Sequence, residues 1–239
     1  MKSVHITLQG KGGVGKSYVS SLLTQYLRSK ELPVIAIDTD PINSTLAGYK
    51  ALDVKTLSLL SEGVINERQF DKLMEEIVAE DSHFVVDNGA SSFIPLSNYI
   101  TENSAIDVML ENGKDVYIHT IITGGQALGD TLAGFVALAD HMPAAAKLVV
   151  WQNEFFGPIE LDGVPFEKFD HYLRRKGRVY GLITIPKQTS STFGQDVQEL
   201  LDRKMTFAEV NMSEHFNLMS KSRLYRVKTT LFNQMAVIM

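Results

Sequence analysis

The chain has 239 residues, of which 44% are hydrophobic and 21% are charged, and its formal net charge is -5. This composition is typical of a folded globular protein, and the length suits one large α/β domain, which we expect to span residues 1–239. The absence of cysteine excludes disulfides, thiolate zinc sites, cysteine nucleophiles and cysteine-ligated iron–sulfur clusters.

Apolar segments alternate with helical segments along the chain, which predicts repeated βα units around a mainly parallel sheet. The predicted strands are Val4–Leu8, Val34–Ile37, Phe84–Val86, Val116–Ile122, Leu148–Trp151 and Val179–Ile185. The predicted helices lie near Lys16–Arg28, Glu67–Ala79, Gly125–Ala139, Phe166–Arg175, Gln195–Arg203 and Leu218–Asn233. Because the strands are uninterrupted runs of Val, Ile and Leu, we expect an α/β fold with helices on both faces of the sheet.

The sequence carries neither a targeting pattern nor a metal-ligand pattern. No apolar run reaches the roughly 18–20 residues of a membrane-spanning helix, and the N-terminus has no signal-peptide pattern, so we expect a cytoplasmic protein. The six histidines do not fall at metal-ligand spacings, which favours surface positions or hydrogen-bonded core positions for them.

A glycine-rich segment, Gly10–Ser17, follows the first predicted strand and precedes the first predicted helix. It fits the pattern Gly-x-x-x-x-Gly-Lys-Ser of a P-loop, in which backbone N–H groups and a helix N-terminus surround a phosphate. Lys16 is expected to bind the terminal phosphates and the Ser17 hydroxyl to ligate Mg²⁺. The predicted nucleotide-binding residues are Gly10, Lys11, Gly12, Gly13, Val14, Gly15, Lys16, Ser17 and Tyr18.

Lys11 is an additional lysine at the start of this loop. With it, the segment Lys-Gly-Gly-x-Gly-Lys-Ser resembles the deviant Walker A motif of the MinD/ParA superfamily of P-loop ATPases, and Lys11 matches the signature lysine of that motif. The resemblance implies ATP and Mg²⁺ as cofactors and a homodimer when ATP is bound. It also implies a catalytic role for Lys16, and one for Lys11 at the nucleotide of the partner. A solvated loop lysine is the alternative for Lys11.

Three aspartates follow predicted strands at positions that match further motifs of this superfamily. The resemblance implies that Asp38 and Asp87 support the Mg²⁺ shell and that Asp40 orients the attacking water. A capped turn before Pro41 is the alternative for Asp40. Many partition ATPases have Asp-x-Pro-Pro where this chain has Asp87–Ala90, so we expect slow or conditional hydrolysis.

The base site is predicted from two later strands. Asn153 ends the strand that begins at Leu148, as in the superfamily where adenine is recognised, and Pro186 follows the next strand as in the loop that packs on the base. The resemblance therefore implies ATP rather than GTP. An asparagine that merely forms the loop is the alternative for Asn153.

Other segments, distributed over nearly the whole chain, are distinctive. They are Leu8–Gly10, Ala47–Leu52, Asp87–Phe93, Thr123–Leu128 and Val150–Asn153 followed by Gly157–Glu160. They resemble the TraL family of plasmid conjugal-transfer proteins, which is related to the plasmid-stability protein StbC. The resemblance implies a nucleotide-binding accessory protein of conjugation or plasmid maintenance, with other proteins of these processes as partners. Two alternatives are an ATP-dependent synthetase of the dethiobiotin-synthetase type and a nucleotide-binding module without turnover.

Two surface features of the C-terminal third bear on further partners. The basic run Arg174–Arg178 makes DNA one candidate partner, bound directly or through another protein, although a solvated helix end explains the run equally well. In the last helix, Leu224, Val227, Leu231 and Met235 form an apolar stripe. This stripe favours a helix that closes the core over one that lies on a membrane, so we do not expect membrane binding.

Overall fold

The computed structural model describes residues 1–40, 43–61 and 64–239. Pro41, which follows the predicted Asp40 site, lies outside these ranges. The strands are β1 Lys2–Thr7, β2 Val34–Asp38, β3 Lys55–Thr56, β4 Leu60–Ser61, β5 Val64–Ile65, β6 His83–Asp87, β7 Lys114–Thr123, β8 Lys147–Asn153, β9 Glu160–Leu161, β10 Val164–Pro165 and β11 Val179–Ile185. The α-helices are α1 Lys16–Arg28, α2 Arg68–Ala79, α3 Phe93–Glu102, α4 Ala105–Glu111, α5 Leu128–His141, α6 Asp170–Leu173, α7 Phe193–Asp202, α8 Phe207–Met212 and α9 Leu218–Ile238.

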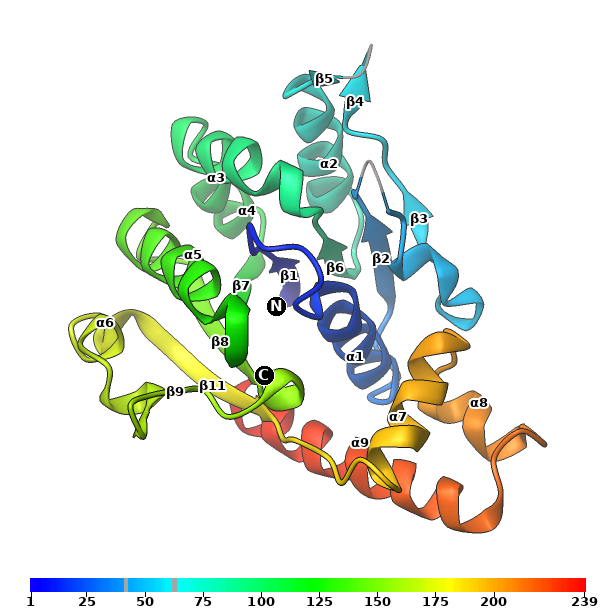
Figure 1. Ribbon diagram of the computed structural model, residues 1–239. Helices are drawn as coiled ribbons and strands as arrows, with labels where there is room; N and C mark the ends of the chain where they lie inside the picture. The colour runs from blue at the N-terminus through cyan, green and yellow to red at the C-terminus, as the bar shows by residue number, and fades with distance from the viewer. Residues whose placement is uncertain (41–42, 62–63) are drawn as a thin grey trace.

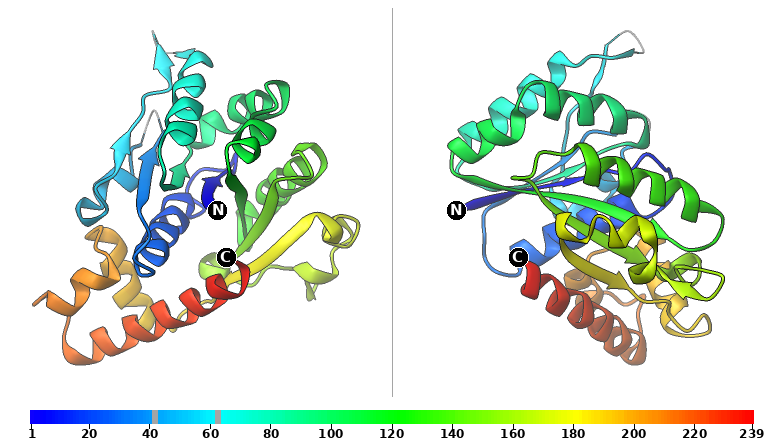
Figure 2. Two further views of the ribbon diagram at one scale, coloured as in Figure 1. Left: turned by 180° about the vertical axis from the view of Figure 1, so that it is seen from behind. Right: turned by 90° about the vertical axis from the view of Figure 1, so that its left-hand side faces the viewer.

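The described residues form a seven-stranded sheet in the order β11-β8-β7-β1-β6-β2-β3, and each neighbouring pair is parallel. Helices α2 to α5 cover one face, and α1 with α7, α8 and α9 covers the other (Figure 1, and edge-on in the right-hand view of Figure 2). Two small antiparallel pairs, β4 with β5 and β9 with β10, lie outside this sheet. The predicted α/β fold with a parallel sheet between two helical layers is thus confirmed.

Each face of the sheet has its own core because side chains alternate along a strand. Val4, Ile6 and Val86 point into the core on the α2 to α5 side, whereas Val85 and Trp151 point into the core beneath α1 and α9. The apolar stripe of α9, predicted to close the core, is buried in the second of these. Within the described ranges, every helix is too short or too polar to cross a bilayer.

Helix α9 also covers β11, the strand at one edge of the sheet. The Gln234 amide accepts a hydrogen bond from the Thr184 N–H at 2.8 Å and donates one to the Thr184 carbonyl at 2.9 Å. Gly181 lies beneath Ile238, and a Cβ there would come within 2.6 Å of the Ile238 side chain. One side-chain amide therefore pairs with the edge strand as a neighbouring strand would.

A chain of hydrogen bonds crosses the sheet from β8 to β6 on the α1 side. It joins Trp151 to His119 (2.9 Å), His119 to His5 (2.9 Å), His5 to Ser3 (2.8 Å) and Ser3 to His83 (2.7 Å). An indole N–H can only donate, so Nδ1 of His119 accepts and its Nε2–H donates to Nδ1 of His5. His5 then donates to Ser3, and the Ser3 hydroxyl to His83. His5, His83 and His119 are therefore hydrogen-bonded core residues, which is one of the two positions that their spacing favoured.

The basic run after α6 is largely occupied by contacts within the protein. Arg175 makes two hydrogen bonds of 2.7 Å to the Asp140 carboxylate. Arg178 donates to the carbonyls that follow α5, at Met142, Pro143 and Ala144. Guanidinium groups near a helix C-terminus can donate hydrogen bonds to its unpaired carbonyls, and their charge interacts favourably with the helix dipole. These two arginines therefore attach the segment to α5.

Candidate functional site

The carboxyl ends of three adjacent strands meet at the glycine-rich loop. Strand β1 leads into the loop, and β6 and β2 follow beside it in the sheet. In the strand register Thr7 pairs with Asp87, and Asp87 pairs with Asp38. The fold therefore brings the two predicted magnesium-shell aspartates next to each other at the base of the loop, where parallel α/β sheets bind ligands.

The loop itself depends on glycine at two positions. Gly13 and Gly15 adopt left-handed φ values of 75° and 101°, which side chains disfavour. A Cβ on Gly15 would also come within 3.0 Å of the Asn153 amide nitrogen. Nothing lies within 4 Å of the Cβ positions of Gly12 and Gly13, so the outer side of the loop backbone is open to a ligand.

The entrance to the loop is held by Gln9, a fully buried residue. Its amide donates to the Ile121 carbonyl at 2.8 Å and to the Thr131 carbonyl at 3.1 Å, which ties the loop to β7 and α5. A Cβ on Gly134 would overlap the Gln9 side-chain oxygen, so glycine at this position leaves room for Gln9. In the sequence Gln9 stands out only as part of the resemblance to TraL proteins, and its contacts show that it anchors the start of the loop.

Lys16 occupies the centre of the site, with only 8% of its surface exposed. Its ammonium donates a hydrogen bond of 2.9 Å to the Lys11 carbonyl. Burial lowers the pKa of Lys16, while the carboxylates of Asp87 and Asp40 act in the opposite direction. A buried cation next to an open loop of N–H groups is suited to bind a polyphosphate.

Asp87 lies below Lys16 and is almost fully buried. The Ser20 hydroxyl donates to it at 2.9 Å, and the Ser17 hydroxyl also hydrogen-bonds to it. Burial, and to a smaller extent the neighbouring Asp38 carboxylate, raises the pKa of Asp87 to about 7 against the lowering effects of the two hydroxyls and Lys16. Lys16 compensates this pair of buried carboxylates only partly, and a divalent cation would complete the compensation.

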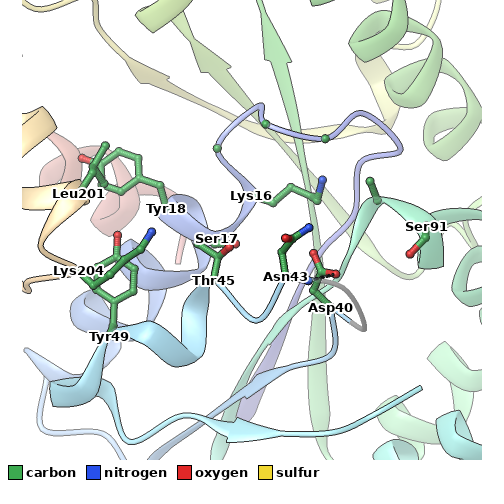
Figure 3. A pocket seen from close by; sticks show the side chains of 14 residues that line it. Lys16, Ser17, Tyr18, Asp40, Asn43, Thr45, Tyr49, Ser91, Leu201 and Lys204 are labelled. Carbon is green, nitrogen blue, oxygen red and sulfur yellow. Dashed lines mark hydrogen bonds between the residues drawn. The ribbon is translucent and has the colours of Figure 1, made fainter. Parts of the chain in front are cut away.

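Asp38 and Asp40 shape the chain that follows β2. The Asp38 carboxylate accepts hydrogen bonds of 3.0 Å from the backbone N–H groups of Asp40 and Ala47. Asp40 lines the same pocket as Lys16, and Figure 3 shows the two side chains pointing toward the same space. A Cβ on Gly89 would come within 2.8 Å of the Asp40 Cγ atom. Gly89, in the segment where many partition ATPases have proline, therefore leaves room for Asp40.

Comparisons with known proteins agree with this geometry. Residues 6–203 match the model of the CobQ/CobB/MinD/ParA nucleotide binding domain. Two curated proteins from Escherichia coli, both named Protein TraL, are 43% identical over 235 residues, which is 98% of this chain and 98% of theirs. The chain belongs to the TraL family, within the CobQ/CobB/MinD/ParA nucleotide-binding family. The resemblance found in the sequence is thereby confirmed.

Solved structures show the same fold at low identity. The MinD cell division protein of Aquifex aeolicus is 15% identical, with a TM-score of 0.52 and 97% of each chain covered. The MinC:MinD complex from the same organism gives 14% identity and a TM-score of 0.52, over 97% of this chain and 96% of that one. At these identities the likeness supports the fold of this TraL-family chain.

The oxygen groups of the TraL-family site fit a Mg²⁺ ion that takes only a few ligands from the protein. Among residues 1–40, 43–61 and 64–239, no three His, Asp or Glu side chains come together as a complete metal cage. Mg²⁺ in nucleotide sites takes few protein oxygens and completes its shell with phosphates and water. The Ser17 hydroxyl, with Asp87 and Asp38 beneath it, offers the oxygen groups that such a shell requires.

Lys11 lies apart from the other predicted catalytic residues. Its ammonium forms an ion pair of 2.8 Å with Asp130 in α5, and it is absent from the residues that line the pocket around Lys16. Both partners are largely exposed, so the pair contributes at most about 1 kcal/mol. Lys11 is therefore held at the surface beside the loop and not over the phosphate position of its own chain.

The two predicted base-site residues lie on neighbouring strands, since Asn153 pairs with Ile185, the residue before Pro186, but their side chains make different contacts. The Asn153 amide donates to the Val14 carbonyl at 3.0 Å and its oxygen accepts from the Phe155 N–H, so this side chain supports the loop. Pro186 lines a groove of about 290 Å³ with Tyr18 and Phe193. Pro186 and Tyr18 thus share a wall suited to a base, while base recognition by Asn153 stays a prediction.

The pocket around Lys16 also contains residues that sequence reasoning missed. Its volume is about 430 Å³, and it extends past Ser17 to Thr45, Tyr49, Leu201 and Lys204. No motif marks these positions, because they come from two segments more than a hundred residues apart that only the fold brings together. Tyr49 lies within a segment that resembles TraL proteins, which was the one available signal.

Proposed function

We propose that this protein binds ATP and Mg²⁺ in the pocket around Lys16, hydrolyses ATP slowly, and acts as an ATP-dependent dimer switch in plasmid conjugal transfer or plasmid maintenance. The observation that carries the proposal is the convergence of Lys16, Asp40 and the buried Asp87 on one open P-loop. Membership of a nucleotide-binding family supports it. The TraL relatives support a role in a plasmid process.

The proposed chemistry assigns a separate task to each side chain. Lys16 neutralises phosphate charge, Asp40 orients the attacking water, and the Ser17 hydroxyl with Asp87 and Asp38 holds the Mg²⁺ shell. Bound Mg²⁺ would neutralise the charge that develops on the phosphate oxygens. Phosphoryl transfer depends mainly on positioning and charge stabilisation, and a cation supplied in trans can contribute about 10³–10⁵ in rate. Without a second copy the rate is therefore expected to be low.

Two features support dimerisation through the carboxyl edge of the sheet. Lys11 lies at the surface of this edge, paired with an exposed aspartate that gives it up at small cost. Exposed apolar side chains flank the loop on either side: Ile94 is 65% exposed, and Phe155 and Phe156 are 52% and 50% exposed. A face that carries both features on each copy suits a two-fold contact, in which each Lys11 reaches the nucleotide of the other copy.

Lys11→Ala is expected to abolish ATP-dependent dimerisation. The affinity for ATP should stay within about threefold of wild type, because Lys11 lies outside the nucleotide pocket of its own chain. The measurement is light scattering of the wild type and the variant with ATP, with ADP and without nucleotide. Asp130→Asn serves as the control, since it breaks the same ion pair but leaves the lysine in place, and it should still dimerise. A Lys11→Ala protein that dimerises normally with ATP would rule out the trans role of Lys11.

Gly89→Ala is expected to slow ATP turnover by about tenfold or more, with ATP binding nearly unchanged, because the new Cβ displaces Asp40. The same separation of binding from turnover is expected for Asp40→Ala. Gly177→Ala is the matched control, since nothing lies within 4 Å of the Cβ position at Gly177. Normal turnover in both Gly89→Ala and Asp40→Ala would remove Asp40 from the mechanism.

The same turnover assay separates the alternatives. A switch should hydrolyse ATP faster when plasmid DNA or transfer proteins are added, whereas a synthetase should consume ATP only with a small carboxylate or amine. A binding module without turnover should return ATP intact after long incubation, in the wild type and in Asp40→Ala alike.

A further inference from the structure

The pocket that contains the P-loop has two ends. Lys16, Asp40 and Ser91 lie at one end, and Tyr18, Tyr49, Leu201 and Lys204 lie at the other, with Ser17 and Thr45 between them (Figure 3). The second end is formed by α1, by the segment after β2 and by the turn between α7 and α8. The proposed chemistry uses the first end and Ser17, and it gives the second end no role.

Lys204 brings a second positive charge into this pocket. It occupies the turn after α7 with a left-handed φ of 51°, and its methylene groups pack against Gly48, where a Cβ would come within 3.3 Å. Its ammonium lies 5.6 Å from the centre of the Tyr49 ring. Lys204 is half-buried, and it takes part in none of the ion pairs found among residues 1–40, 43–61 and 64–239. A partly buried cation without a carboxylate partner, facing a pocket, is suited to an anionic ligand.

The two neighbouring tyrosines at this end of the pocket are neutral. Burial raises the pKa of Tyr49 to about 12, so its hydroxyl remains protonated at neutral pH. The Tyr18 hydroxyl is buried without a hydrogen-bond partner among the described residues. Neither tyrosine opposes the charge of Lys204, and the end of the pocket is therefore positive overall.

We propose that Lys204 is a second phosphate-binding cation of the nucleotide site, acting on the phosphate chain from the end opposite Lys16. This inference rests on the proposed binding of a nucleotide at the P-loop. The ligand class is a nucleoside di- or triphosphate, whose several negative charges match two separated lysines. Lys204 is a binding residue here and takes no part in hydrolysis.

The position of Lys204 connects the phosphates to the C-terminal helices. Leu201, at the end of α7, lines the same pocket, so α7 and the turn after it both face the ligand. Helix α7 is joined to α9 by the ion pair between Asp196 and Arg223. A phosphate bound by Lys204 therefore restrains the turn that links α7 to α8, and through α7 it restrains α9.

The test is the affinity of the full chain for ATP and for ADP, measured by calorimetry in wild type and Lys204→Met. Methionine keeps the unbranched stem beside Gly48 and removes only the charge. We expect affinities for both nucleotides to fall about 5- to 30-fold, as for loss of one charged hydrogen bond that is partly exposed. Inorganic tripolyphosphate should show the same loss, which assigns the effect to phosphate and not to the base. Lys204→Arg should recover most of the affinity.

Lys228→Met is the matched control. Lys228 is also a half-buried lysine over an aromatic ring, 5.2 Å from the centre of Phe232, but it lies outside the pocket of Lys16. Its substitution should leave both affinities unchanged. A second measurement is hydrogen exchange in residues 193–212, where ATP should slow exchange in wild type and in Lys228→Met but not in Lys204→Met.

The outcomes separate this inference from the proposed function. If wild type binds neither nucleotide, both fail. If wild type binds and Lys204→Met binds equally well, with the same protection of residues 193–212, the inference on Lys204 is wrong and the proposed nucleotide site stands. Equal losses in Lys204→Met and Lys228→Met would also overturn it, since they would reflect only the net charge of the protein.

Discussion

Acidification from pH 6 to pH 4 is expected to lower the free energy of unfolding by about 2.5 kcal/mol through His119 alone. Burial lowers the pKa of this imidazole from 6.5 to about 3 in the folded protein. Below pH 6.5 the unfolded chain therefore binds a proton that the folded chain does not, and stability is lost as the pH falls toward 3. His5 acts in the same direction, because burial, and then the charges of His119, His83 and Lys147, lower its pKa well below the ordinary value.

The measurement is urea unfolding followed by circular dichroism at pH 7, 6, 5 and 4, in wild type and in His119→Gln. Glutamine does not titrate, and its amide can accept from Trp151 and donate to His5 as the imidazole does. The variant should therefore lose about 2.5 kcal/mol less than wild type between pH 6 and pH 4. His215→Gln, at an exposed histidine, is the control and should follow wild type. If His119→Gln and wild type lose stability in parallel, the buried imidazole is not what makes the protein acid-sensitive.

Lys16→Ala is expected to weaken ATP binding by on the order of 100-fold or more, because it removes the buried cation that faces the open loop. The stability of the nucleotide-free protein should hold or rise slightly, since burial of this ammonium is unfavourable and lowers its pKa. Lys16→Ala should thus remove the stabilisation that ATP provides without lowering the stability of the nucleotide-free protein.

Thermal unfolding with and without Mg²⁺-ATP measures both quantities. A ligand present at 100 times its Kd adds about 2.7 kcal/mol to the folded state, which raises Tm by several degrees in a protein of this size. This increase should be present in wild type and in Lys11→Ala and absent in Lys16→Ala. Lys11 is the matched control, because it is a lysine of the same loop that lies outside the pocket. An unchanged ATP-dependent increase in Lys16→Ala would contradict nucleotide binding at this loop.

The sheet and the position of the P-loop between β1 and α1 are predictable from the sequence because both depend on local patterns. Helix α1 has the predicted bounds, Lys16–Arg28, since a P-loop motif marks its first turn. The strands of the sheet other than β3 differ from the predicted ranges by at most two residues at either end, as expected for uninterrupted Val, Ile and Leu runs. Asp38 and Asp87 were placed at strand ends, and the parallel register then makes them neighbours.

Other elements were missed for physical reasons. Helix α3 contains Pro95, which weakens a helical pattern in the sequence although it stands in the first turn, where a missing N–H costs little. Helices α4 and α8 are too short for their periodicity to be recognised. The pairing of His5 with His119 spans 114 residues of sequence and depends on strand register, which residue type alone does not specify.

The role of individual side chains was harder to predict than their location. Asn153 lies at the end of its strand as expected, but its amide holds the P-loop backbone at Val14. Lys204 has no motif, and only the packing of α7 beside the segment after β2 brings it to the pocket. Arg175 and Arg178 read as a basic surface in the sequence, yet they bind Asp140 and the end of α5.

The pairing of Gln234 with Thr184 bears on self-association. An open edge strand offers unpaired backbone groups to a strand of another chain, and such an edge is a site of aggregation. Here one amide side chain occupies the backbone groups of Thr184, and Ile238 covers Gly181. Helix α9 therefore blocks the pairing of a second copy with β11 and the filament growth that such pairing would allow. The contact between two copies that we propose at the carboxyl ends of the strands would leave this covered edge unchanged.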